Sequence, residues 1–198
     1  TAELEGVYTS DAKCVAIGEC GLDYSRMFSP KPSQLVALEH QVRLACRLRA
    51  PLFLHERDHE TNPLGSHRDL LAILDTHGVD SARVCVHCFT SSDEGQLREY
   101  VRRGYMIGIT GFVCKKKRGA SLRAFLGNNT LPLAQCLLET DSPFMQPDGW
   151  PPNTPNEPSS IPVIARAVAE CLGVPVATVL AVTTASAHRF FGLPTHTA

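Results

Sequence analysis

Residues 51–55 read Pro51-Leu52-Phe53-Leu54-His55, a short apolar run that ends in an imidazole. A continuous apolar stretch of roughly four to eight residues indicates a strand that is covered on both faces. Similar runs recur along the chain, and each leads to a polar residue with chemical capability. These residues are Glu19, His55, His87 and Asp141.

Between the apolar runs, hydrophobic residues recur at intervals of three and four, which is the period of a helix that buries one face. The predicted strands are residues 14–19, 51–55, 82–87, 105–110 and 134–139. The predicted helices are residues 33–50, 66–77, a helix that opens at the capping box 91–94 and ends near residue 104, and residues 121–126, 161–172 and 175–191. This alternation predicts an α/β fold with a parallel sheet or barrel.

Polar and proline residues mark where these elements begin and end. Ser66 is the predicted N-cap of the second helix, and Ser91 with Glu94 has the spacing of a capping box for the third. Seven prolines lie within residues 143–162, which predicts an extended loop, because proline cannot donate a backbone hydrogen bond.

Length and composition favour one globular domain over residues 1–198, with 43% hydrophobic and 20% charged residues. The 19 Lys and Arg nearly balance the 20 Asp and Glu, so any polyanion site must be local. The eight cysteines lie beside apolar residues, which favours reduced thiols. No apolar run reaches the length of about 20 residues that spans a membrane, so we expect no membrane contact. We expect a cytoplasmic or nuclear location, with organelle targeting left open.

Residues that end successive parallel strands converge on one face of the fold. Two imidazoles and two carboxylates at these positions form a ligand set suited to a divalent metal such as Zn²⁺, Mn²⁺, Fe²⁺ or Mg²⁺. An isolated histidine at a strand end is more often structural, and an aspartate there often caps the next helix. The coincidence of four such residues favours the metal site.

Six segments resemble motifs of the TatD family of metal-dependent deoxyribonucleases, and their residues are most similar to those of its TatD proper branch. They are residues 18–24, 54–57, 86–90, 107–114, 138–143 and 156–158. Two positions depart from the family pattern. Ser91 follows His-Cys-Phe-Thr where the family has glycine, and Glu56 occupies a small-residue position between His55 and Arg57. We expect Glu56 to point away from the site, because side chains alternate along a strand.

The resemblance implies a TIM-type (β/α) barrel of the metal-dependent hydrolase superfamily. Such barrels have eight strands, so the chain is expected to lack the first strands and to be the C-terminal three quarters of the domain. The resemblance also implies two divalent ions, Mg²⁺ or Mn²⁺ with Zn²⁺ as an alternative. Glu19 would bridge them, His55 and His87 would complete one site, and Asp141 would hold the other ion and activate water. The implied catalytic residues are Glu19 and Asp141.

The implied activity is hydrolysis of DNA phosphodiester bonds by a 3'-5' exonuclease acting on single strands or DNA ends, in repair or degradation. Arg57 and the run Lys115, Lys116, Lys117 and Arg118 are candidate phosphate contacts, and Trp150 is a candidate for stacking on a base. The basic run is equally consistent with a solvated turn. We expect a monomer that binds DNA, with self-association if the upstream strands are absent.

Two alternatives remain open from the sequence. The same strand-end pattern serves amidohydrolase-type enzymes that cleave amides or esters. A homologue that lacks upstream strands could instead bind nucleic acid without turnover.

Overall fold

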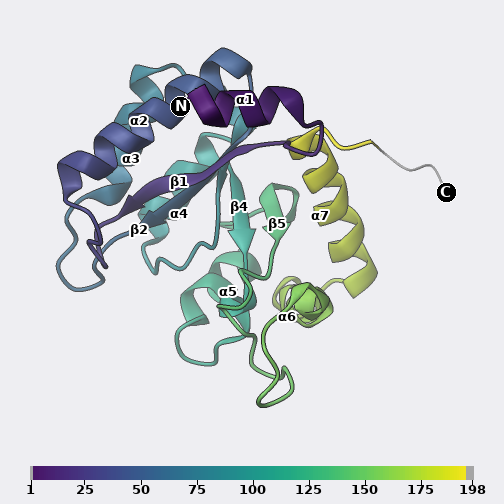
Figure 1. Ribbon diagram of the computed structural model, residues 1–198. Coiled ribbons are helices and arrows are strands. Elements are labelled where there is room, and N and C mark those ends of the chain that lie inside the picture. The colour runs from purple at the N-terminus through teal and green to yellow at the C-terminus, as the bar shows by residue number, and fades with distance from the viewer. Residues whose placement is uncertain (1, 195–198) are drawn as a thin grey trace. The chain divides into compact units, whose positions relative to one another are not determined.

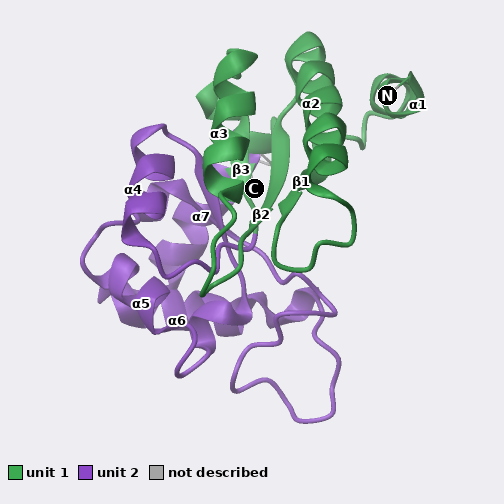
Figure 2. Ribbon diagram, turned by 90° about the vertical axis from the view of Figure 1, so that its left-hand side faces the viewer, with its two compact units in different colours: residues 1–87, 190–192 green, residues 88–189, 193–198 purple. Residues whose placement is uncertain are grey.

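The computed structural model describes residues 2–194, which contain alternating strands and helices in the order expected for an α/β fold (Figure 1). These residues form two compact units (Figure 2). The first unit runs to His87 and includes residues 190–192, and the second begins at Cys88. The prediction of a single domain over residues 1–198 stays a prediction.

Three parallel strands form the sheet of the first unit, in the order β1 (Ile17–Asp23), β2 (Leu52–Arg57) and β3 (Val84–Val86). A short 3-10 turn, η1 (Ser81–Arg83), precedes β3. The prediction that the first strand ends at Glu19 is wrong. The strand begins later, at Ile17, and continues four residues beyond Glu19, because the chain bulges there and then resumes its pairing with β2.

Two helices of the first unit, α2 (Lys31–Leu48) and α3 (Ser66–Thr76), pack against β1 and β2 (Figure 2). Their apolar residues and those of β2 form a core in which Leu38, Leu52, Leu54 and Leu70 are at most 1% exposed. Burial of each such leucine contributes about 1.5–3 kcal/mol. The first helix, α1 (Ala2–Ser10), buries no residue.

The predicted N-cap role of Ser66 is wrong. The N-cap position of α3 is Gly65, and Ser66 is the first helical residue. The carboxylate of Asp58 accepts hydrogen bonds from the backbone N–H groups of Leu64, Gly65 and Ser66. Asp58 therefore satisfies the N–H of the first helical residue from outside the helix, and the Ser66 hydroxyl donates to Glu56 instead.

The second unit contains two parallel strands, β4 (Met106–Ile109) and β5 (Cys136–Leu138), which pair with each other. Its helices are α4 (Glu94–Arg102), α5 (Ala120–Gly127), α6 (Ile161–Leu172) and α7 (Val176–Phe191), with the 3-10 turns η2 (Gly111–Cys114), η3 (Leu133–Gln135) and η4 (Pro158–Ser160). The last two residues of α7 belong to the first unit. Helix α6 packs against α5, η2 and β5.

The predicted capping box is wrong. Helix α4 begins at Glu94, and its N-cap is Asp93, whose carboxylate accepts from the backbone N–H of Gln96 at 3.1 Å. Ser91 instead accepts from the N–H of Asp93. The predicted proline-rich loop is confirmed for residues 143–157, which contain no helix or strand, but residues 158–162 form η4 and the first residues of α6.

No single helix among residues 2–194 is long and apolar enough to cross a membrane, although α6 and α7 pass that test when they are counted together as a bent pair.

Candidate metal centre

Glu19 lies on a β-bulge in β1. Gly18 pairs with Phe53 and Cys20 pairs with Leu54, so Glu19 is the extra residue without a partner on β2. Its φ of 65° lies in the left-handed region, which is costly for a residue with a side chain and is found most often at functional sites. A bulge re-aims one side chain while the strand continues. It therefore turns the Glu19 carboxylate toward the histidines.

The glycines that flank Glu19 permit this local structure. Gly18 has a φ of 113°, and a Cβ atom at this position would lie 2.4 Å from the carbonyl oxygen of Phe53. A Cβ atom on Gly21 would lie 1.8 Å from the carbonyl oxygen of His55. Only glycine allows β1 and β2 to approach this closely on both sides of the bulge.

His55 lies within β2, on the face opposite to α2 and α3. Leu54 and Glu56 face the helices, as the contact between Glu56 and Ser66 of α3 shows, and alternation places His55 on the other face. The expected orientation of Glu56, away from the site, agrees with this contact. The His55 side chain is 29% exposed, and Asp23 Oδ2 lies 3.4 Å from its Nε2 atom. Burial lowers the pKa of His55, and the Asp23 carboxylate partly opposes this.

His87 immediately follows β3, and its side chain is only 5% exposed. The imidazole packs against the ring of Phe53, with centroids 5.1 Å apart, and its backbone N–H donates to the carbonyl of Leu54. These contacts hold the ring in place before any ligand binds. The Nε2 atom of His87 lies 3.2 Å from Oε1 of Glu19.

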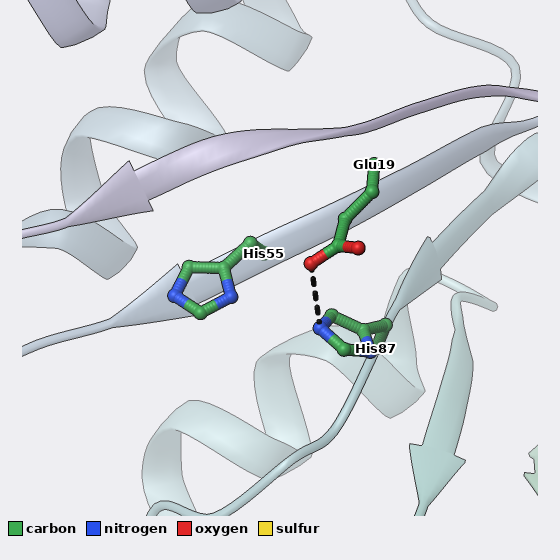
Figure 3. A group of neighbouring side chains, drawn as sticks. All are labelled: Glu19, His55 and His87. Atoms are coloured by element: carbon green, nitrogen blue, oxygen red, sulfur yellow. Dashed lines mark ion pairs between the residues drawn. The ribbon is translucent and has the colours of Figure 1, made fainter. Parts of the chain in front are cut away.

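The side chains of Glu19, His55 and His87 converge from three neighbouring segments of the first unit (Figure 3). One potential ligand atom from each lies within 4.8 Å of the others. Figure 3 shows the Glu19 carboxylate directed to the space between the two imidazoles. The structure thus brings together three of the four residues predicted as metal ligands.

The donor set and its surroundings fit a divalent metal ion. Two neutral imidazoles and a carboxylate are ligands that Zn²⁺ and Mn²⁺ accept in proteins. Figure 3 shows Nδ1 of His55 on the side of Glu19 and His87, and Nε2 of His87 lies 3.2 Å from Oε1 of Glu19, so each ring presents one nitrogen to the carboxylate. No other group of three or more such side chains occurs in the described part of the chain.

Arg57 is the last residue of β2 and lies on the same face as His55 by alternation. Its side chain has no ion pair or side-chain hydrogen bond with any of the described residues, although its carbonyl accepts from Tyr24. A guanidinium without a protein partner can bind a phosphate through two parallel hydrogen bonds.

Asp141 lies in the second unit, three residues after β5, and its φ of 52° is left-handed. Its carboxylate and that of Glu139 lie near Cys88, whose backbone N–H donates to Glu139. Burial raises the pKa of the Cys88 thiol to about 12; a contact with Thr110 opposes the rise, and the two carboxylates add to it. All eight cysteines are free thiols, which agrees with the predicted reduced state.

The loop after Asp141 is held by Asn156, a buried residue of the resemblance motif at residues 156–158. Its Nδ2 group donates to the carbonyl oxygens of Thr140 and Phe144, and its Oδ1 atom accepts from the Ser160 hydroxyl at 2.7 Å. No physical role was predicted for this motif. In the structure it fixes the backbone on both sides of Asp141.

The basic run lies in the same unit as this loop, and its members differ. Lys115 pairs with Asp148 at 2.8 Å, and Arg118 lies over the Phe112 ring at 5.4 Å. Lys116 and Lys117 are exposed. The indole N–H of Trp150 donates to the carbonyl of Pro155 at 3.1 Å, so part of this side chain packs within the loop.

Sequence reasoning missed Asp23 as a neighbour of the site. It is the last residue of β1, and its place in the Gly-Leu-Asp segment was the available signal. Phe53, which supports His87, was treated only as an apolar strand residue.

The parallel strands and the group of Glu19, His55 and His87 are features of the (β/α) barrel fold of the metal-dependent hydrolase superfamily. Solved structures agree with the predicted fold. A TatD homologue from Escherichia coli matches 98% of this chain and 70% of its own with a TM-score of 0.80 and 29% identity. A TatD family hydrolase from Entamoeba histolytica matches with the same TM-score at 23% identity, covering 98% and 68% of the two chains, and shows the fold alone.

The family is shown by sequence. The model of the family described as "TatD related DNase" matches residues 1–192. A protein from Cronobacter sakazakii named "3'-5' ssDNA/RNA exonuclease TatD" is 41% identical over 184 residues, which are 91% of this chain. The chain spans 66% of that relative's length. The chain belongs to the TatD related DNase family.

Proposed function

We propose that the protein is a metal-dependent nuclease that removes nucleotides from the 3' end of single-stranded DNA. The observation that carries this proposal is the convergence of Glu19, His55 and His87 within 4.8 Å, on a chain that belongs to the TatD related DNase family. The Cronobacter relative is named as an exonuclease of single-stranded RNA as well as DNA. We therefore extend the substrate class to single-stranded RNA.

Glu19, His55 and His87 would hold a divalent ion, which when bound supplies charge neutralisation at the phosphate and an acidified water. The chain's own residues prepare this site. The bulge aims the Glu19 carboxylate, and Phe53 restrains the His87 ring. The two histidines would bind as neutral imidazoles, because only the neutral ring has a free lone pair.

Asp141 is proposed as a ligand of a second ion and as the group that orients or deprotonates the attacking water. This role rests on the resemblance of residues 138–143 to the family motif. Its carboxylate stays close to Cys88 and Glu139, and Asn156 fixes the adjacent backbone. Mg²⁺ and Mn²⁺ are the preferred ions, and Zn²⁺ is an alternative.

Contacts with the nucleic acid are proposed for Arg57, Lys116 and Lys117, whose cationic groups are available to phosphates. Lys115 and Arg118 would contribute less, because each already has a partner. For stacking on an unpaired base, Phe144 is favoured over Trp150, since its side chain is 69% exposed.

The decisive experiment uses metal-stripped protein and a single-stranded oligonucleotide labelled at its 5' end. Mg²⁺, Mn²⁺ or Zn²⁺ is restored separately, and the products are resolved by length. We expect a ladder that shortens from the 3' end and depends on the metal. Metal binding without cleavage would instead support the alternative of a homologue that binds nucleic acid without turnover.

A matched control excludes a contaminating nuclease. Glu19→Gln keeps the side-chain shape and removes the ligand charge. Glu39→Gln makes the same change in a pair of the same geometry, because Glu39 Oε1 lies 3.2 Å from Nε2 of His77. Cleavage should disappear in the first variant and persist in the second.

The amide or ester hydrolase stays as the second candidate, and no residue of the structure favours it over phosphate chemistry. A panel of p-nitrophenyl phosphodiesters and esters distinguishes the two. The predicted monomeric state and the predicted cytoplasmic or nuclear location stay predictions.

A further inference from the structure

Asp23 is fixed at the end of β1 by hydrogen bonds from its own unit. Its Oδ1 atom accepts from the backbone N–H groups of Ser25 at 3.0 Å and Arg26 at 2.7 Å. Its backbone N–H donates to Gln34 Oε1 at 2.8 Å, and its carbonyl accepts from Gln34 Nε2 at 3.1 Å. Three of its polar atoms are therefore occupied by contacts that do not involve the metal centre.

The remaining atom, Oδ2, faces His55 at a distance of 3.4 Å from Nε2. The only other cation that it approaches among the described residues is Arg26, at 3.7 Å. The Asp23 side chain is 17% exposed, so water competes weakly for this oxygen. A carboxylate can only accept, so it favours an N–H rather than a lone pair on the facing ring nitrogen.

The two ring nitrogens of His55 face different surroundings. Figure 3 shows the nitrogen next to the side-chain attachment, Nδ1, on the side of Glu19 and His87, and the other nitrogen directed away from them. The nitrogen directed away is Nε2, which is buried, has no hydrogen-bond partner within residues 2–194 and has Asp23 Oδ2 as a neighbour.

We propose that Asp23 is a positioning residue of the metal centre, which holds His55 in the tautomer with the proton on Nε2 and leaves the lone pair of Nδ1 for the metal. The inference rests on the proposed metal site. A small rotation of the ring would bring Nε2–H to hydrogen-bonding distance. Histidine ligands of metals generally donate their second N–H to such a partner, and its loss weakens metal affinity about 10–100-fold.

The test uses Asp23→Asn, which keeps the shape and one acceptor oxygen. The amide oxygen is expected to remain with Ser25 and Arg26, because their N–H groups require an acceptor. The NH₂ group would then face Nε2 and donate to it, which moves the ring proton to Nδ1. That tautomer has no lone pair on the side of Glu19.

Two measurements follow this change. Long-range ¹H–¹⁵N spectra of metal-free protein labelled with ¹⁵N-histidine, recorded above about pH 8 where unperturbed imidazole is neutral, report the tautomer. The His55 signals are those missing in His55→Gln. Calorimetric titration with Zn²⁺ gives the affinity. We expect the Nε2-protonated tautomer in wild type, the Nδ1-protonated tautomer in Asp23→Asn, and about 10–100-fold weaker Zn²⁺ binding in the variant.

Asp69→Asn is the matched control. Asp69 has a similar exposure, 16%, and lies in the same unit, but its partners are Lys31, Tyr24 and Arg68. It should leave the tautomer and the Zn²⁺ affinity unchanged. Circular dichroism and urea unfolding verify that both variants fold.

The outcomes separate this inference from the proposed nuclease function. An Nδ1-protonated His55 in wild type, or an unchanged tautomer in Asp23→Asn, overturns the role of Asp23 whatever the activity. The expected tautomers without any nuclease activity would leave the role of Asp23 intact and remove the proposed function. If Asp23→Asn fails to fold, an Nδ1-protonated His55 in the metal-free wild type still overturns the role of Asp23.

Discussion

Two histidine–glutamate pairs in the first unit have the same geometry and different surroundings. His87 Nε2 lies 3.2 Å from Glu19 Oε1, and His77 Nε2 lies 3.2 Å from Glu39 Oε1. The His87 ring is 5% exposed and follows a strand, whereas the His77 ring is 20% exposed and lies at the end of α3. Only the first pair has a third ligand, His55, within reach among the described residues.

The difference shows that the distance between a histidine and a carboxylate does not define a metal site. The pair between α2 and α3 is a contact between packed helices. The pair near β3 is held by a bulge, a supporting aromatic ring and a second histidine. The following predictions test this distinction, in order of decreasing expected effect.

Glu19→Gln should lower the rate of metal-dependent cleavage by at least about 1,000-fold, because metal-ion stabilisation is worth several kcal/mol. Glu39→Gln should leave the rate within about threefold, since Glu39 lies outside the group of potential metal ligands and a partly exposed ion pair contributes little. Initial rates on a labelled oligonucleotide measure both. Equal losses in the two variants would contradict the distinction between the pairs.

Gly18→Ala should lower the free energy of unfolding by about 2–3 kcal/mol, because alanine is strained at a φ of 113° and its Cβ would meet the Phe53 carbonyl. Gly78→Ala is the matched change. Gly78 has a φ of 58° with open space around it, so only the left-handed backbone costs energy, about 1–2 kcal/mol. Urea unfolding measures both, and Zn²⁺ affinity should fall only in Gly18→Ala.

Asp58→Asn should lower the free energy of unfolding by about 1 kcal/mol at pH 7. Burial acts to raise the pKa of Asp58, but hydrogen bonds from four backbone N–H groups hold it below its usual range. The lowered pKa stabilises the folded protein fully above the pKa of an aspartate in the unfolded chain, near 3.9. This stabilisation is lost as the pH falls through the lower pKa that Asp58 has in the folded protein.

The difference between Asp58→Asn and wild type should therefore shrink as the pH falls below about 4. Urea unfolding at pH 7 and pH 3 measures it. Asp11→Asn, an exposed carboxylate that accepts from one backbone N–H, is the control and should show a smaller difference at both values. A constant difference for Asp58→Asn would show that its charge is not responsible.

Lys117→Ala should weaken binding of single-stranded DNA a few-fold and reduce the slope of log affinity against log salt by about 0.7. Lys115→Ala should change the slope less, because its ammonium already pairs with Asp148. Fluorescence anisotropy in the Glu19→Gln background measures binding without cleavage. Slopes that equal the wild-type slope in both variants would assign the basic run to a solvated turn.

The sequence predicted the α/β class, all five strands and most helices, because apolar periodicity reports burial directly. It also predicted Glu19, His55 and His87 as partners, because parallel strands place their ends together. It could not predict the bulge at Glu19, since one unpaired residue leaves no mark on composition. The predicted N-cap roles of Ser66 and Ser91 were wrong, because the carboxylates of Asp58 and Asp93 accept the backbone N–H groups at these helix starts.

The role of Asp23 was also beyond the sequence. A carboxylate next to an apolar strand predicts a cap or a turn, and Asp23 does accept from Ser25 and Arg26. Its second oxygen faces His55 only because Asp23 and His55 lie two residues apart in the register of β1 and β2, after the bulge has shifted that register.

The bulge also divides β1 into two segments whose buried residues alternate in opposite phase. Before it, the buried position is odd-numbered, at Ile17, and after it the buried positions are even-numbered, at Cys20 and Leu22. Because a shift of one residue exchanges the two faces of a strand, straightening the bulge while Glu19 is retained would force one half of β1 to present its wrong face. When substitutions are designed in this strand, the buried positions must therefore be assigned separately before and after Glu19.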